Sequence, residues 1–182
     1  MSTLSLALLV ALATGAVASA ETAQPYAGLD RRAIKALSPE RIEGLIEGSG
    51  LGYARAAELN GLPGPAHVLD LVSELALTPE QEASVRALHD AMRSEARAIG
   101  AEIVAAEQTL DEALSNRTAD PETVARMTAR IAALEGRLRA VHLNAHLATA
   151  PLLTRHQVQA YARARGYSVP AGATPEGHRH GG

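Results

Sequence analysis

The sequence predicts an all-α protein built on a long antiparallel helical hairpin, with short helices before it and one short helix after it. Three observations predict this fold. Residues 78–114 and 121–150 place apolar side chains at intervals of three and four, the spacing of one helix face. Each stretch begins with a polar capping residue followed by proline, which is typical of a helix start. Finally, convincing strand patterns are missing from the sequence.

Short helices are expected ahead of the hairpin. Ser38-Pro39-Glu40 combines a capping serine, a first-turn proline and a first-turn acid, so a helix begins there and ends near Gly48. The glycine- and proline-rich run 60–65 is a turn that separates two further helices. The segments expected in order are an extended arm over 21–37 with a helical stretch at 31–36, and helices over 38–48, 51–59 and 66–75.

The first long helix is predicted from an uninterrupted pattern. Between Thr78 and Leu114 the chain has no proline and a single glycine, Gly100. At 1.5 Å per residue, a helix of this length would extend roughly 55 Å. Its apolar stripe consists of Val85, Leu88, Met92, Ala96, Ile99, Ile103, Ala106, Leu110 and Leu114.

The second long helix begins at Asp120-Pro121-Glu122, after the polar turn 115–119, and Pro151 ends it. Its stripe consists of Val124, Met127, Ile131, Leu134, Leu138, Val141, Ala145 and Ala148. Two long helices joined by a short turn predict an antiparallel pair with a seam like that of a coiled coil. A last helix is expected over 154–165.

Three further apolar residues, Leu143, Leu147 and Leu152, lie outside the stripe of the second long helix. They must pack on the short N-terminal helices, on a second copy of the chain or on a bound client. Because a two-helix layer buries little area by itself, we expect a homodimer, although simple intramolecular packing explains Leu143 and Leu147 nearly as well.

The N-terminal residues predict export. The apolar run 4–13 is followed by the small-residue site Ala18-Ser19-Ala20, a pattern typical of a secretory signal peptide over 1–20. The run is shorter than the ~20 apolar residues that cross a bilayer, and a buried N-terminal helix is the alternative. The expected product is a periplasmic protein without a membrane span. Its segments would be an arm over 21–37, a helical domain over 38–167, and a disordered, histidine-containing tail over 168–182.

Composition excludes several classes of function. The chain has no cysteine, so disulfides, thiolate metal sites and cysteine nucleophiles are ruled out. The net charge of −3 gives no basic surface for nucleic acid. The absence of phenylalanine and tryptophan disfavours a ligand pocket of the usual aromatic kind. Because no phosphate-binding loop or activated nucleophile is recognisable, we expect no enzyme, no catalytic residue and no organic cofactor.

One short motif occurs twice, as Leu77-Thr78-Pro79-Glu80-Gln81 and as Leu153-Thr154-Arg155-His156-Gln157. In both copies threonine can cap a helix while glutamine at the third helical position bonds back to the threonine amide, which is a capping box. The leucine before the cap can staple onto Val158 in the second copy, whereas Glu82 occupies that place in the first. The functional members of the motif are Leu77, Thr78, Gln81, Leu153, Thr154 and Gln157.

This repeated LTxxQ motif resembles the Spy/CpxP family, and residues 57–69 look like its periplasmic heavy-metal sensor branch. The resemblance covers about residues 25–167. It implies a hooked helical hairpin that dimerises into a shallow cradle. Members of the family include ATP-independent chaperones, an envelope-stress signalling partner and metal sensors, so the resemblance leaves the activity open.

Three histidines form the candidate metal site. His142 and His146 are four residues apart and share one helix face. Leu143 stands where a zinc protease of the HExxH type needs its glutamate, so hydrolysis is not expected. If the hairpin turn centres near 117–118, His89 lies level with His146. Three imidazoles with water or a carboxylate would suit Zn, Ni, Co or Cu. The alternative is three partly exposed histidines without a ligand.

Other metal donors are weaker candidates. His178 and His180 in the tail could bind metal loosely, or could simply be solvated. Met92 is level with His142, and its seam position favours a core role. His67 and His156 are interpreted as a local hydrogen-bonding residue and a surface residue.

Two functions therefore compete. One is a metal sensor or buffer that uses His89, His142 and His146. The other is a holdase chaperone that binds unfolded proteins on an apolar concave face and needs no specific metal site. An envelope-stress signalling protein is an alternative partner to an unfolded client.

Overall fold

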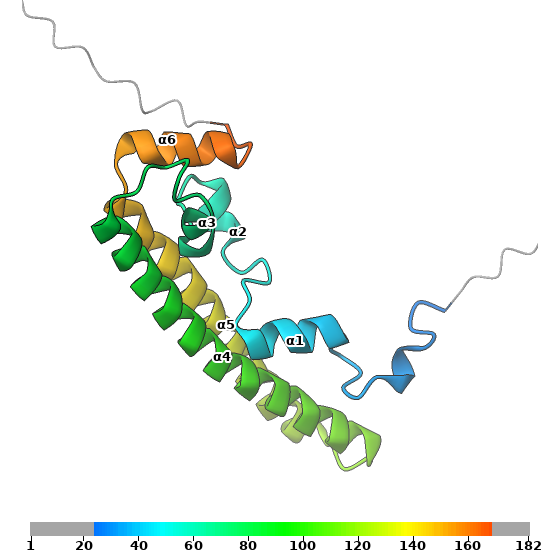
Figure 1. Ribbon diagram of the computed structural model, residues 1–182. Helices are drawn as coiled ribbons and strands as arrows, with labels where there is room; N and C mark the ends of the chain where they lie inside the picture. The colour runs from blue at the N-terminus through cyan, green and yellow to red at the C-terminus, as the bar shows by residue number, and fades with distance from the viewer. Residues whose placement is uncertain (1–23, 169–182) are drawn as a thin grey trace, which may run out of the picture.

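The computed structural model describes residues 24–168, and its regular elements there are all helices, which confirms the predicted all-α class (Figure 1). The elements in chain order are η1 (Leu29–Arg31), α1 (Pro39–Glu47), α2 (Arg55–Leu59), α3 (Pro65–Asp70), α4 (Pro79–Ser115), α5 (Pro121–Thr149), η2 (Ala150–Leu152) and α6 (Arg155–Ala164).

The long antiparallel hairpin consists of α4 and α5, which lie side by side along their length in Figure 1. Thr78 caps α4 by accepting a hydrogen bond from the Gln81 amide. Asp120 caps α5 in the same way, at 2.7 Å from the Thr123 amide nitrogen. Arg117 adopts a left-handed conformation in the connecting turn. The predicted hairpin and its two starting points are therefore confirmed.

The first hydrophobic core lies where α1 crosses the hairpin. Its buried members are Ile34, Leu37, Leu45, Ala96, Ile99, Ile103, Ala106, Leu134 and Leu138. Gly100 explains how α1 comes so close, because a Cβ atom at this position would lie 2.0 Å from the Leu45 carbonyl oxygen. The single glycine of α4 thus allows direct backbone contact between the two helices.

A second core joins α3, the start of α4 and α6 at the other end of the hairpin, where α6 crosses it in Figure 1. Its buried members are Val68, Leu75, Val85, Leu153 and Tyr161. Leu77, Leu152 and Val158 pack against it, so both motif leucines contribute to one apolar cluster.

Both LTxxQ segments form complete capping boxes, as the sequence predicts. The structure also brings the two boxes together. Gln81 and Gln157 donate to each other's carbonyl oxygens, with both nitrogen–oxygen distances 2.9 Å. The repeated motif therefore connects the start of α4 to the start of α6.

Three of the short helical segments predicted from the sequence, 31–36, 51–59 and 66–75, differ from the structure. The helical stretch over 31–36 is replaced by the 3-10 turn η1 and a series of bends. This arm is held by Lys35, whose backbone amide and Nζ donate to the Asp111 carboxylate at 3.1 and 2.9 Å, rather than by helical bonds. The helix predicted over 51–59 begins only at Arg55, since Leu51 and Gly52 have positive φ angles of 44° and 80° that are incompatible with a right-handed helix.

The helix predicted over 66–75 ends at Asp70, and turns continue to Ala76, which has a φ angle of 46°. In residues 24–168, every helix is too short or too polar for a bilayer crossing. The predicted signal peptide over 1–20 lies outside the described residues, as does nearly all of the predicted tail.

Candidate functional site

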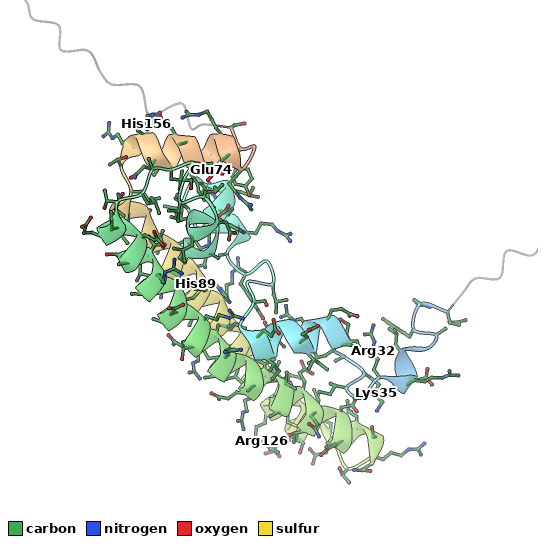
Figure 2. All side chains as sticks on the ribbon, in the orientation of Figure 1. Arg32, Lys35, Glu74, His89, Arg126 and His156 are labelled. Carbon is green, nitrogen blue, oxygen red and sulfur yellow. The ribbon has the colours of Figure 1, made fainter. Side chains whose placement is uncertain are left out.

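An open pocket of about 500 Å³ lies on the hairpin beside α2, α3 and the loop that follows α1. The three histidines that the sequence singles out, His89, His142 and His146, all line it. Figure 2 labels His89 on the first long helix, α4, and the other two belong to α5. The hairpin register thus places the three imidazoles around one volume.

His142 is the most deeply buried of the three, with only 3% of its surface exposed. Its ring stacks on Tyr53, with the planes 6° apart and the centroids 5.7 Å apart. Its Nε2 atom is buried and has no hydrogen-bond partner. Burial, with a smaller contribution from His146, lowers the pKa of His142. The imidazole is therefore neutral near pH 7 and keeps a nitrogen lone pair.

Tyr53 is fixed by groups from two helices. Its hydroxyl donates to the Glu135 carboxylate on α5. Arg41 on α1 donates to the same hydroxyl and to Glu135, at 3.0 Å from Oε1. Burial and the nearby Glu135 carboxylate raise the pKa of Tyr53 well above its usual range, so the hydroxyl keeps its proton. This arrangement holds a flat aromatic wall against His142.

His146 is 9% exposed and is oriented by a backbone carbonyl. Its Nδ1 atom lies 2.8 Å from the Leu62 oxygen, and this bond requires a proton on Nδ1. In the neutral ring, Nε2 then carries the lone pair. A backbone carbonyl bonded to one ring nitrogen is the usual way to orient a metal-binding histidine through the other. Gly64 lies against this edge, since a Cβ atom there would be 2.6 Å from Nε2.

His89 and Met92 contribute from α4. The His89 side chain is 22% exposed, and its Nδ1 lies 3.1 Å from an Asp90 oxygen. Met92 is half-buried, lines the pocket and belongs to neither hydrophobic core, so the sequence interpretation of Met92 as a core residue is wrong. Its thioether adds a soft donor on the side of the pocket formed by α4.

Glu58 is a pocket residue that the sequence analysis did not identify. It is only 7% exposed, and its Oε1 accepts a hydrogen bond from the Tyr161 hydroxyl at 2.6 Å. Its Oε2 is buried without any hydrogen-bond partner. Leaving a buried acceptor unsatisfied costs about 1–3 kcal/mol, more for a charged group. No sequence pattern distinguishes Glu58 from the exposed acids, because its burial depends on the docking of α6.

The donors of this pocket suit a transition metal. Imidazole nitrogens with one carboxylate are typical of Zn, Ni, Co or Cu sites, whereas Mg and Ca prefer oxygen alone. Two of these donors, His142 Nε2 and Glu58 Oε2, are buried atoms without partners. Arg55 and Arg93 also line the pocket, but both are exposed, so solvent screens their charge.

The side chains are not drawn together as they would be around an ion. Within residues 24–168, no group of three or more His, Cys, Asp or Glu side chains is close enough to hold a metal as it stands. A shared ion would require these side chains to move closer together. The pocket therefore has donor atoms that suit a transition metal, but they are too far apart to share one ion as they stand.

The comparison with protein families matches residues 49–160 to a family described as heavy-metal resistance. The chain belongs to this heavy-metal resistance family. The match confirms the resemblance to Spy/CpxP-like proteins and spans Glu58, His89, His142 and His146. Comparisons with curated proteins and with solved structures give no significant match.

Of the remaining histidines, His67 lines the pocket, His156 lies on α6, and the other two fall outside the described residues. Figure 2 labels His156 on α6, where it is exposed as predicted. His67 lies near Glu58, with its Nδ1 3.5 Å from Oε1, and it also lines the pocket. His178 and His180 fall outside the residues that the structure describes.

Proposed function

We propose that this member of the heavy-metal resistance family is a periplasmic metal sensor or buffer, and that it binds a divalent transition metal in the pocket lined by His89, His142 and His146. The observation that carries the proposal is the convergence of these three histidines on one volume. They come from two helices, and more than 50 residues of sequence separate His89 from His142.

Two of the histidines are prepared for coordination. His142 has a buried, unpartnered Nε2 and a lowered pKa, so little proton competition opposes binding near pH 7. His146 has its Nδ1 committed to the Leu62 oxygen, which leaves Nε2 for a metal. His89 is more exposed and lies on the opposing helix, so it would close the site from α4.

Binding would change the protein as well as fill the pocket. The donors are not close enough to share an ion as they stand, so coordination would draw side chains of α4 and α5 together. A sensor requires such a difference between its free and bound states, because a ligand shifts a conformational equilibrium only through unequal affinity for the two states. A bound ion would supply positive charge and structural cross-linking, with no catalytic step.

A second candidate function is a holdase chaperone, and exposed apolar side chains favour it. Leu59 is 63% exposed and Leu147 is 57% exposed. Leu59 lines a shallow depression of about 400 Å³ together with Leu51, Arg55 and Arg139, so both apolar and basic groups line it. Such a surface could hold an unfolded chain or a second copy of this protein. Homodimerisation and export through the residue 1–20 signal peptide are part of the proposal.

Calorimetric titration with Zn²⁺, Ni²⁺, Co²⁺ and Cu²⁺ tests the leading proposal. The reference protein is the full chain with His178→Ala and His180→Ala, which removes the tail donors. We expect defined stoichiometry with micromolar or tighter affinity, and loss of binding in the additional variant H89A/H142A/H146A. His156→Ala is the matched control, because this histidine is exposed on α6.

Equal affinity in the triple variant would refute the metal site in the pocket. The chaperone candidate is checked separately by light scattering of a denatured client at equimolar ratio. Suppressed aggregation without any metal binding would make the chaperone the better description.

A further inference from the structure

Glu58 presents one carboxylate oxygen to the pocket without a partner. The residue belongs to α2, and 7% of its surface is exposed. Its Oε2 atom is buried and makes no hydrogen bond. His146 Nδ1 lies 3.8 Å from Oε2, and that nitrogen donates its proton to the Leu62 oxygen instead.

The other oxygen of Glu58 is bound to α6. The Tyr161 hydroxyl donates to Oε1 at 2.6 Å, and Arg165 Nε lies 3.4 Å from the same atom. Tyr161 is itself buried in the second hydrophobic core. One carboxylate therefore faces the pocket with Oε2 while Oε1 holds the last helix.

We propose that Glu58 Oε2 is an additional ligand of the metal in this pocket, that Tyr161 is the residue that positions the carboxylate, and that metal binding therefore stabilises the docking of α6. The inference rests on the proposed function, since it concerns the same pocket. It adds an oxygen donor from α2 to the histidines of α4 and α5.

The two carboxylate oxygens of Glu58 can act at the same time, Oε2 as a metal ligand and Oε1 as the acceptor of the Tyr161 hydrogen bond. A metal-bound carboxylate is usually hydrogen-bonded through its second oxygen, and such outer partners orient the ligand. Tyr161 already occupies that role at Oε1, whereas Oε2 is free. An ion on Oε2 would satisfy the unpartnered atom and hold Glu58 in the position that Tyr161 requires. Occupancy of the pocket is thereby linked to α6.

Glu58→Gln is the direct variant, because glutamine keeps the shape and can still accept from Tyr161 while losing the anionic oxygen. We expect Zn²⁺ affinity to fall at least about tenfold, within the range of about 10–100-fold for a disturbed metal environment. Glu74→Gln is the matched control, since Glu74 is exposed after α3. The Co²⁺ absorption spectrum of Glu58→Gln should also change, because its d–d bands depend on the ligands.

Tyr161→Phe tests the positioning role without altering any ligand. We expect weaker Zn²⁺ binding with an altered Co²⁺ spectrum, and Tyr167→Phe serves as the control on the same end of the chain. Hydrogen exchange provides a measurement that does not depend on any variant. In the unsubstituted protein, Zn²⁺ should slow the exchange of amides in Arg155–Ala164 at least about tenfold if that helix docks through Glu58.

The outcomes separate this proposal from the proposed function. If the unsubstituted protein binds no metal, or if H89A/H142A/H146A binds equally well, the proposed function fails and this inference fails with it. If binding depends on the histidines while Glu58→Gln keeps the same affinity and the same Co²⁺ spectrum, only the Glu58 proposal is overturned. Unchanged exchange in α6 on Zn²⁺ addition would overturn the coupling to α6.

Discussion

The side-chain amides of Gln81 and Gln157 hydrogen-bond each other in both directions, at 2.9 Å each way. Each amide also completes a capping box at the start of its own helix. Gln157 additionally donates to the Leu75 oxygen at 3.2 Å, and Gln81 donates to the Leu152 oxygen at 2.8 Å. The two copies of the sequence motif are thus one connected structural element between α4 and α6.

Replacing either glutamine should destabilise the protein, and Gln157 should matter more. Gln157 is buried, whereas Gln81 is half-buried, so Gln157→Ala leaves more unsatisfied groups. We expect a loss of about 1–3 kcal/mol for Gln157→Ala, in the range for buried hydrogen-bonding groups, and a smaller loss for Gln81→Ala. Urea unfolding of both variants and of the double variant measures the coupling, which should be about 0.5–1.5 kcal/mol. Strictly additive losses would contradict the reciprocal pair.

Gly100 and Gly136 should respond oppositely to alanine. Both are helical, but a Cβ atom at Gly100 would lie 2.0 Å from the Leu45 oxygen, whereas one at Gly136 meets nothing within 4 Å. Gly100→Ala should push α1 off α4 and cost about 2–3 kcal/mol, as in an overpacked core. Gly136→Ala should stabilise the protein by up to about 1 kcal/mol through helix propensity. Thermal unfolding checks both, and a neutral Gly100→Ala would contradict the close approach of α1.

The start of α5 should weaken in acid. Hydrogen bonds from Thr123 hold the pKa of Asp120 below its usual value of 3.8. A carboxyl with a depressed folded-state pKa stabilises the fold above the unfolded-state pKa, and the contribution is lost as the pH falls below about 3.8. Asp120→Asn caps a helix equally well without titrating. The unfolding midpoint of the parent protein should therefore exceed that of Asp120→Asn at pH 6, and the difference should disappear as the pH falls to 2.5. A constant difference between the two proteins would count against this assignment.

Gly64→Ala should impair metal binding specifically. Its backbone conformation suits any residue, at φ −87° and ψ 144°, so no backbone strain is expected. The added Cβ would lie 2.6 Å from His146 Nε2 and would have to displace the ring. Zn²⁺ affinity should drop by about 10-fold or more, as for other disturbed ligand orientations. Calorimetry measures it, with Gly136→Ala as the control, and unchanged affinity would show that His146 Nε2 is not used.

The sequence predicted the hairpin well because two independent patterns agreed there. Apolar spacing marked the seam, and the capping residues Thr78 and Asp120 marked where each helix begins. Two residues at the ends of the predicted seam are exposed instead of packed: Leu114, which is 55% exposed, and Ala148. Near the turn, where Leu114 lies, there are only two helices, so this residue has little to pack against.

The short segments were harder to predict, because tertiary contacts decide them. Positive φ angles at Leu51 and Ala76 interrupt helices that local composition favours. The histidine cluster was accessible from spacing and hairpin register alone. Glu58 was not, since its burial requires α2, α5 and α6 to meet, and no local pattern records that meeting.

The proposed function requires that the pocket of His89, His142 and His146 holds a transition metal. A crystal structure of the zinc-loaded protein, with anomalous data collected at the zinc edge, tests it most directly. We expect an anomalous peak in the pocket at about 2.0–2.1 Å from the Nε2 atoms of His142 and His146. A fully loaded crystal whose only peaks lie outside this pocket would contradict it.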